Sequence, residues 1–302
     1  WLSQLKVNPI PELLGSGDDA LIFRVRKDIL GEFSEEGETP MKDDSRFKTL
    51  VRRQKPDGSW RGSGSKKNDD IWTFFTTLRS LYELVDRGCD YGDEIFERGA
   101  NFMVSTQTDD GDFRGAYGPD IPAPDYSGMV IDVLIQGRFE DESVIEKGMK
   151  WLISERRKKG GWAVPVLRSK SRRDDSSHNV TGMAVRAFAS DPKERYKKEA
   201  QKAGEFLSKR IFKPDNYPDR RGVEYWGKLA YPFWFTDALS TLNVLSRLGF
   251  GLSKGRMKRA YKWLLKVQEE DGYWHTDFRK RQREADPWLT YAAILTIKSL
   301  AE

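Results

Sequence analysis

The sequence predicts an all-α fold, an (α/α)6 toroid in which outer and inner helices alternate around a barrel. Three observations predict it. A unit of about fifty residues repeats along the chain, each unit carries an amphipathic helix, and each carries a second helix that is apolar nearly all round. A helix with one polar side belongs in an outer layer, and a helix packed on both sides belongs in an inner one. Residues 1–302 are therefore expected to form a single toroid domain.

Each repeat is marked by a turn that ends in an aromatic residue. Gln54–Trp60, Gln107–Phe113 and Gln268–Trp274 share the pattern Gln-x-x-Asp-Gly-x-aromatic, and Arg156–Trp162 is a degenerate copy. The segment that ends at Trp226 is a stretched copy. Asp-Gly supplies a turn, because Gly takes a positive φ without strain. We expect the Gln, Gly and aromatic residues to be structural staples between helices.

Amphipathic stretches predict the outer helices. In residues 254–267, apolar residues recur every three or four positions and Lys or Arg fills the other face. Trp1–Leu5 is the candidate for the stub of a sixth outer helix. The five outer helices are expected at residues 43–53, 94–106, 142–156, 194–210 and 254–267.

Nearly apolar stretches predict the inner helices. They contain small residues at many positions, so neighbouring helices can pack against them from both sides. Asp19–Leu30 is a sixth candidate of this kind, and six pairs suffice to close a barrel. The other five inner helices are expected to begin at Trp72, Tyr126, Asn179, Phe235 and Trp288.

Composition excludes several classes of protein. With 38% hydrophobic and 33% charged residues, the chain is globular rather than disordered. The longest stretch without a charged residue, Pro287–Ile297, is too short to span a membrane. Cys89 stands alone, which excludes an intrachain disulfide, and no secretory pattern opens the chain, so a cytoplasmic location is expected. High charge with one Cys and few Met is typical of heat-adapted, thermostable proteins.

The turns Gln54–Trp60, Gln107–Phe113 and Gln268–Trp274 resemble the QW motifs of the squalene–hopene and oxidosqualene cyclases. The same superfamily includes the protein prenyltransferase β subunits. The resemblance covers nearly the whole chain and implies an α/α toroid with a central cavity. It does not fix the activity, because such toroids carry several chemistries and binding functions.

The acid motif of the cyclases is altered in this chain. The family uses Asp-x-Asp-Asp, whose middle carboxyl group must stay protonated. The nearest match is Lys67–Asp70, in which Lys67 replaces the first carboxylate and favours ionised Asp69. Asp69 and Asp70 remain candidate catalytic residues, and either one equally fits the N-cap of the helix that follows.

The metal motifs of the superfamily are also altered. Prenyltransferases hold zinc with an Asp-x-Cys pair, whereas here Asp237 is followed by Ala238 and Leu239. The nearest match to the magnesium motif Asp-Asp-x-x-Asp is Asp174–His178, which ends in His. We therefore expect no metal and no cofactor, and retain Asp237 as a candidate catalytic carboxylate.

The loops that run from each aromatic staple into the next inner helix are rich in cations. They share one face of the toroid, where the N-termini of the inner helices add partial positive charge. This mouth is predicted to hold an anionic group, although a charge run is as often a solvated face. The cations expected to contact the ligand are Lys67, Arg172, Arg173 and Arg281.

Aromatic and polar residues are expected just inside this mouth. His178, close in sequence to Asp174 and Asp175, is a candidate general acid or base, and it equally fits a capping histidine. The residues expected to line the substrate pocket are Trp72, Tyr126, Asn179, Tyr231, Trp234, Trp288 and Tyr291.

Three functional hypotheses follow. The first is an isoprenoid-handling protein that binds a small anionic or amphiphilic ligand in an aromatic cavity. This hypothesis is compatible with peripheral contact of the protein with a membrane. The second is a polysaccharide lyase or hydrolase, in which Asn179 neutralises a uronate and His178 is the base. The third is a non-catalytic binding protein. Nucleic acid is not expected, since no known stacking motif is present.

Overall fold

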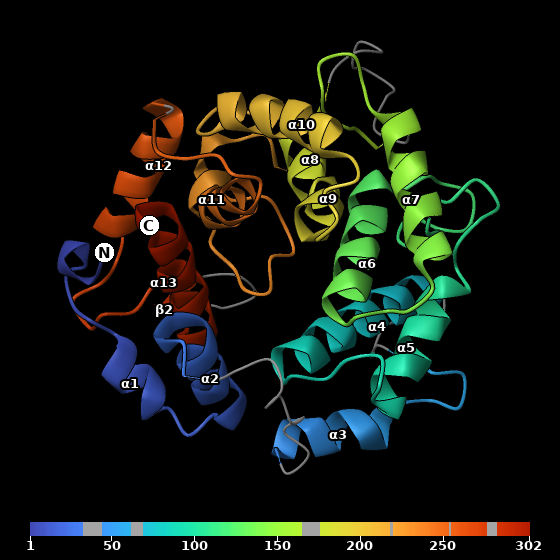
Figure 1. The fold of residues 1–302 in the computed structure, drawn as a ribbon, viewed down its shortest axis with the longest axis horizontal. Coiled ribbons are helices and arrows are strands. Elements are labelled where there is room, and N and C mark those ends of the chain that lie inside the picture. Colours follow the sequence, from blue (N-terminus) through green and yellow to red (C-terminus); the bar gives the residue numbers. More distant parts are fainter. Residues whose placement is uncertain (33–43, 62–68, 165–175, 218–219, 254, 277–282) are drawn as a thin grey trace.

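The computed structural model describes residues 1–32, 44–61, 69–164, 176–217, 220–253, 255–276 and 283–302. Their helices form a ring of two layers, which confirms the predicted all-α toroid (Figure 1). The outer layer consists of α1 (Ile10–Leu14), α3 (Ser45–Arg53), α5 (Glu94–Val104), α7 (Glu142–Glu155), α10 (Lys197–Arg210) and α12 (Gly255–Lys266). The inner layer consists of α2 (Asp19–Arg24), α4 (Asp69–Asp86), α6 (Pro124–Gln136), α8 (His178–Ala184), α9 (Arg186–Ser190), α11 (Ala238–Arg247) and α13 (Pro287–Ala301).

The two layers differ in burial as the sequence predicts. Every residue of α6 from Pro124 to Leu134 is buried, because α6 packs against α4, α7, α8 and α9. In α12 the buried residues are Met257, Ala260, Tyr261 and Leu264, which lie on one helical face. Burial of apolar surface therefore comes from both sides of the inner helices and from one side of the outer helices.

The aromatic staples connect each outer helix to the following inner helix. The indole N–H of Trp60 donates to the carbonyl oxygen of Leu50 at 2.8 Å, and its backbone N–H donates to Oγ1 of Thr77 at 3.0 Å. The same pair of bonds recurs at Trp162 and Trp274. These aromatic residues are structural staples, as predicted.

The glutamine of each turn reaches the next repeat. Nε2 of Gln54 donates to the carbonyl oxygens of Gly58 at 3.0 Å and of Ile95, in α5, at 2.9 Å. Gln107 makes the same two kinds of bond, the second to α7. Arg156 occupies the glutamine position of the degenerate repeat and donates to α10. One side chain thus connects the end of an outer helix to the first turn of the next outer helix.

Gln268 closes the ring. Its Nε2 donates to the carbonyl oxygens of Val7 at 2.7 Å and Gly272 at 2.8 Å, and its Oε1 accepts from the backbone N–H of Lys6 at 2.8 Å. The last turn therefore binds the first residues of the chain, and the two termini lie on the same side of the ring (Figure 1).

Glycine is required in these turns for two reasons. Gly58 has φ +86°, and a Cβ atom there would lie 2.1 Å from the carbonyl oxygen of Arg98. Gly111 has φ +110°, and a Cβ atom would lie 2.5 Å from the carbonyl oxygen of Lys147. Each turn thus packs directly on the backbone of the next outer helix.

Two differences from the sequence predictions concern how the ring is built. The sixth outer helix is α1, whereas Trp1–Leu5 contains only a 3-10 turn, η1 (Leu2–Gln4). The inner helix expected at Phe235 begins at Ala238, because the side chain of Asp237 caps its first turn. These corrections leave the ring unchanged and place the residues before Asp237 in an irregular, non-helical segment.

Shorter elements complete the chain. The π-helix η2 (Val25–Leu30) continues α2, and the 3-10 helix η7 (Val223–Gly227) carries Trp226. β1 (His275–Thr276) pairs antiparallel with β2 (Glu284–Ala285), with His275 opposite Ala285. Among the helices described, none is both long and apolar enough to cross a membrane.

Replacing Gln268 by Ala tests the closure of the ring. The change leaves the backbone groups of Lys6, Val7 and Gly272 without this partner, so we expect the free energy of unfolding to fall by about 1–3 kcal/mol. Chemical denaturation measures the loss. The matched control is Gln107→Ala, which removes a staple inside the ring.

Hydrogen exchange separates closure from general destabilisation. In Gln268→Ala the amide of Lys6 should exchange much faster than in Gln107→Ala at equal global stability, because only Gln268 binds that amide. Equal exchange in the two variants would contradict a closing role for Gln268.

Candidate functional site

The segment between η7 and α11 crosses the centre of the ring (Figure 1). Tyr231 donates from its hydroxyl to Oδ1 of Asp86, at the end of α4, at 2.7 Å. The carbonyl oxygen of Phe233 accepts from Arg186, on α9, at 2.9 Å. Further along, Thr236 binds Asn179 on α8. Since α4 and the neighbouring pair α8 and α9 lie on different sides of the ring (Figure 1), the chain itself fills part of the cavity that the sequence predicts to be open.

A pocket of about 380 Å³ lies beside this segment. Half of its residues belong to the second halves of inner helices, and it lies toward the C-terminal ends of α4, α6 and α11. The sequence instead places the ligand at the N-terminal ends. We call this cavity the central pocket. It is lined by Arg24, Asp28, Tyr82, Asp86, Gln136, Arg186, Tyr231, Pro232, Phe233, Asn243, Arg247, Tyr291, Ala292 and Leu295.

Two carboxylate–tyrosine pairs face each other in the central pocket. Tyr231 donates to Asp86 at 2.7 Å, and Tyr291 donates to Oδ2 of Asp28 at 2.5 Å. Arg24 lies between the pairs: its Nε donates to the carbonyl oxygen of Asp86 at 3.0 Å, and its Nη1 lies 3.7 Å from Oδ2 of Asp28. The guanidinium therefore joins the backbone at the end of α4 to the carboxylate of Asp28.

The carboxyl group of Asp86 is suited to proton transfer. Asp86 keeps some accessible surface because it lines the pocket, but protein surrounds it on other sides, and this burial raises its pKa from 3.8 to about 6. The positive charge of Arg24 and the hydrogen bond from Tyr231 oppose the shift without cancelling it. Burial likewise raises the pKa of the Tyr231 and Tyr291 phenols, so both remain protonated donors.

A second charged network borders the same pocket. Asp132 is fully buried in α6 and accepts from the hydroxyl groups of Tyr82 and Ser190. Nε of Arg186 lies 3.8 Å, and Nη2 of Arg247 3.6 Å, from the Asp132 carboxylate. A buried carboxylate with two guanidinium partners is electrostatically compensated, which fixes both cations at the pocket wall.

The predicted aromatic residues divide between the two ends of the ring. Tyr231 and Tyr291 line the central pocket, and Trp288 stacks on Tyr231 with ring centroids 5.9 Å apart. At the opposite end, Tyr126 packs edge to face in a cluster of rings, near the exposed Trp72. The sequence thus identified several aromatic residues of the interior but assigned them all to one mouth.

Two further predicted residues have structural contacts. Trp234 is buried, packs edge to face on Tyr82, and lies under the guanidinium of Arg79. The side-chain oxygen of Asn179 accepts from the backbone N–H of Thr236 at 3.1 Å. Both residues therefore hold the segment between η7 and α11 in place.

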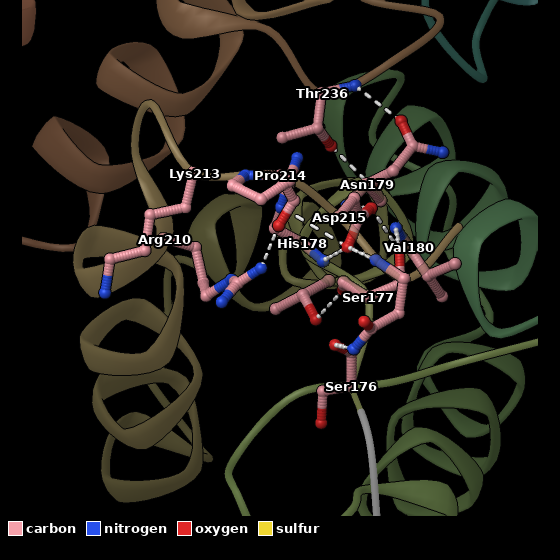
Figure 2. A network of polar contacts seen from close by, with 12 residues as sticks. Ser176, Ser177, His178, Asn179, Val180, Arg210, Lys213, Pro214, Asp215 and Thr236 are labelled. Carbon is pink, nitrogen blue, oxygen red and sulfur yellow. Dashed lines mark hydrogen bonds and ion pairs between the residues drawn. The ribbon is translucent and has the colours of Figure 1, made fainter. Parts of the chain in front are cut away.

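His178 lies at the buried start of α8 (Figure 2). Its ring stacks on Trp226 with centroids 4.5 Å apart, and its Nδ1 lies 3.3 Å from Oδ1 of Asp215 without hydrogen-bond geometry. Asp215 instead accepts from the backbone N–H groups of His178 and Asn179 and from the hydroxyl of Ser177. The network caps α8, and burial lowers the pKa of the His178 imidazole from 6.5 to about 4.

The predicted carboxylates do not meet in one place. Asp69 and Asp70 lie in the first turn of α4, where Asp70 is exposed. Asp237 is buried at the start of α11, where Oδ1 accepts from the N–H of Ser240 at 2.7 Å in a capping box. Burial raises the pKa of the Asp237 carboxyl to about 7. A catalytic role for these three residues, or for His178, stays a prediction.

The predicted basic mouth lies largely outside the described residues, and so do Lys67, Arg172, Arg173 and Arg281. Of the described rim cations, Arg220 lies over the ring of Phe235, 3.3 Å from its centroid. No group of three or more His, Cys, Asp or Glu within the described ranges is arranged to hold a metal ion.

Sequence analysis missed the charged residues of the central pocket. Asp132 lies inside the apolar stretch of α6, Asp86 ends α4, and Arg186 begins α9. A charge in a helix packed on both sides must be paired or face a cavity, because burial of an isolated charge is costly. That pattern was the available signal for these three residues.

The chain matches a known family of proteins. The sequence model of a family described as "Squalene-hopene cyclase C-terminal domain" matches residues 112–285, more than half of the chain. No curated protein matches the sequence. The family match confirms the resemblance to the terpenoid cyclases.

Three solved structures are similar to this chain. A protein from Actinoplanes is 18% identical in sequence with a TM-score of 0.46, and the match covers 94% of this chain and 90% of that protein. A polysaccharide lyase is 12% identical with a TM-score of 0.44, and the match covers 94% of this chain and 89% of the lyase. A variant of a type II terpene cyclase from Scytonema, in complex with geranylgeranyl dihydroxybenzoate, has 12% identity and a TM-score of 0.44, with 97% and 99% covered. At such identities the similarity does not indicate function.

A pH series tests the burial of His178. The unfolded chain binds a proton at His178 near pH 6.5 and the folded chain only near pH 4, so stability is full above pH 6.5 and falls as the pH drops toward 4. His178→Phe keeps an aromatic ring against Trp226 and removes this titration. Relative to the variant, wild type should lose about 3 kcal/mol between pH 7 and pH 4.

Denaturant unfolding of both proteins at each pH measures this difference. Raised carboxyl pKa values at Asp86 and Asp237 shift stability in the opposite sense, but they are common to both proteins and cancel in the comparison. A wild-type-minus-variant difference that stays flat from pH 7 to pH 4 would contradict the buried, neutral imidazole.

Proposed function

We propose, from the premise that this chain belongs to the squalene-hopene cyclase C-terminal domain family, that its central pocket binds a small amphiphilic molecule of isoprenoid type. The observation that carries the proposal is that aromatic rings and carboxylates line the same cavity. The rings of Tyr231, Phe233 and Tyr291 supply apolar faces, and the carboxylates of Asp28 and Asp86 supply hydrogen-bond acceptors. Such a mixture suits a ligand with an apolar body and a polar end.

The polar end of the ligand has defined partners. Each tyrosine hydroxyl already donates to a carboxylate, so its own oxygen is the acceptor turned to a ligand. A ligand hydroxyl can therefore donate to the oxygen of Tyr291, or directly to Asp28 or Asp86. The volume of about 380 Å³ falls in the range of small-molecule sites.

The charge of the polar end depends on Arg247. The C-termini of α4 and α11 point toward the pocket and disfavour an anion. Arg24 and Arg186 donate to backbone carbonyl oxygens, whereas the contacts described for Arg247, to Asp132 and Ser190, use Nη2, and its side chain is 32% exposed. An anionic group, as the sequence predicts for the ligand, would therefore bind at Arg247.

Asp86 supports a proton-transfer role in the same pocket. A carboxyl group with a pKa of about 6 exchanges its proton close to neutral pH, as a general acid or base requires. Turnover of a bound isoprenoid that titrates near pH 6 and is lost in Asp86→Asn would support an enzyme. Binding without turnover would leave the alternative of a non-catalytic binding protein.

A second candidate function rests on the polarity of the lining. Arg, Asp, Tyr, Asn and Gln side chains outnumber apolar ones in the central pocket, as in sites for sugars and uronates. A lyase acting on uronate polymers would release unsaturated products that absorb in the ultraviolet. Absence of that absorbance across pectate, alginate and heparinoid substrates would remove this candidate.

A single hydroxyl tests the isoprenoid proposal. Tyr291→Phe removes the phenol that binds Asp28 and keeps the aromatic ring, so we expect the affinity for geranylgeraniol to fall by about 3–10-fold. Titration followed by tryptophan fluorescence measures it, since Trp288 stacks beside the pocket. Geranylgeranoic acid and geranylgeranyl diphosphate, titrated alongside, give the preferred charge of the polar end.

The control is Tyr273→Phe, at a turn on the outside of the ring and away from the central pocket, which should bind as wild type does. If no isoprenoid binds to wild type, or if Tyr291→Phe binds all three ligands unchanged, the proposal is wrong.

A further inference from the structure

We propose that the solvent-facing side of α12, with the residue Lys213 that follows α10, is a cationic surface that binds the headgroups of an anionic lipid bilayer. The contact is electrostatic and lies on the outside of the ring (Figure 1), so it does not depend on the ligand of the central pocket. We call this region the α12 surface. It consists of Lys213, Arg256, Lys258, Arg259, Lys262 and Lys266.

The charge of α12 differs from that of equivalent outer helices. Between Gly255 and Lys266, α12 carries five cations and no acid. In α5 two acids accompany one cation, and in α7 three acids accompany two cations. All three helices have the same place in the repeat, with one face buried and the other toward solvent. Solubility alone therefore does not require a face of one sign on α12.

The cations of α12 also oppose the stability of their own helix. Arg256 and Lys258 lie in its first turn, where the helix dipole disfavours positive charge. Lys258, Lys262 and Lys266 follow at intervals of four residues, a spacing at which like charges repel. α3 is the other outer helix without an acid, but two of its cations lie in its last turn, which the dipole favours. An anionic partner would offset both unfavourable effects in α12.

The α12 surface has no carboxylate partner of its own. Among the residues that the structure describes, none of its six cations makes an ion pair. At the start of α12, the charges of Arg256 and then Arg210 lower the pKa of the Lys213 ammonium group. A cluster of uncompensated cations attracts an anion. The three acids that follow α12 have partners elsewhere: Glu269 with Arg283, Glu270 with Lys6, and Asp271 with His275.

The composition of the α12 surface favours a bilayer over a protein or a nucleic acid. The centre of a protein interface is usually apolar, but none of the large hydrophobic side chains exposed in the described residues belongs to this surface. The aromatic residues of α12, Tyr261 and Trp263, are buried or half-buried, so no ring is presented to stack on a base. Lysine, a point charge, outnumbers arginine. Clusters of about four to eight cations on a helix face are typical of segments that bind anionic headgroups.

Co-sedimentation with lipid vesicles tests the proposal. Wild type should bind vesicles of phosphatidylcholine with about 30% phosphatidylserine, and not vesicles of phosphatidylcholine alone. Binding should weaken steeply between about 0.1 M and about 0.5 M NaCl, because salt screens exposed charges. In the triple variant Lys258→Gln/Lys262→Gln/Lys266→Gln, the partition coefficient should fall by at least about 20-fold, since each lysine near an anionic surface contributes about a factor of five.

Two further variants make the test specific. Replacing the same three lysines by Arg keeps the charge and should keep the binding. Lys147→Gln/Lys150→Gln/Lys158→Gln removes three exposed charges from α7 and the turn that follows it, and should bind as wild type does. The α12 glutamine variant should be at least as stable toward denaturant as wild type, because it removes repulsion between like charges. Its loss of binding would then not come from unfolding.

The outcomes decide the proposal either way. Absence of binding to phosphatidylserine vesicles, or equal binding by wild type and the α12 glutamine variant, would overturn it. An equal loss in the α7 variant would also overturn it, because the effect would then come from net charge. Binding to duplex DNA but not to vesicles would overturn it in favour of a nucleic-acid partner. None of these results affects the isoprenoid titrations of the central pocket.

Discussion

The closed ring depends on one recurring interaction, the amide or guanidinium side chain that joins the end of an outer helix to the next repeat. Gln54 does this between α3 and α5, and Arg156 does it between α7 and α10. A chain of such links alone would form an open array, as stacked repeats do. The ring closes because the last link, at Gln268, binds Lys6 and Val7 at the other end of the chain. Terminal residues that would fray in most domains are thereby tied down.

Most of this fold could be predicted from the sequence, because its information is local. Each repeat contains the sequence signals for its own helix, turn and staple within about fifty residues. Trp60, for example, bonds to Leu50 and Thr77, which are close to it in sequence. The errors occurred where the repeat is short or stretched. α1 has five residues, too few for a helical period, so periodicity does not predict it. The repeat that ends at Trp226 is stretched, so its spacing does not predict the irregular segment that follows it.

The candidate site was less predictable because its contacts join distant parts of the chain. Tyr231 and Asp86 are 145 positions apart, and Tyr291 and Asp28 are 263 apart. Sequence analysis identified both tyrosines as pocket residues but assigned them to the N-terminal ends of the inner helices, where cations cluster. Helical periodicity places a side chain on a face of its helix. It does not show where the segment between η7 and α11 enters the ring and contacts the inner helices of other repeats. That segment fills part of the centre, and the central pocket lies beside it. Asp69 and Asp70, at the start of α4, line a separate pocket of about 570 Å³.

Ring closure and the central pocket are physically coupled. One wall of the pocket is the seam where the first and last inner helices meet, and Tyr291 of α13 binds Asp28 of η2 across it. Lys298 donates to the carbonyl oxygens of Asp28 and Ile29 along the same seam, and the indole of Trp288 donates to Asp18. The positions of Asp28 and Arg24 relative to Tyr291 therefore depend on the ring being shut. A site built across the seam can form only after the two ends of the chain have come together, so its geometry reports the state of the whole toroid.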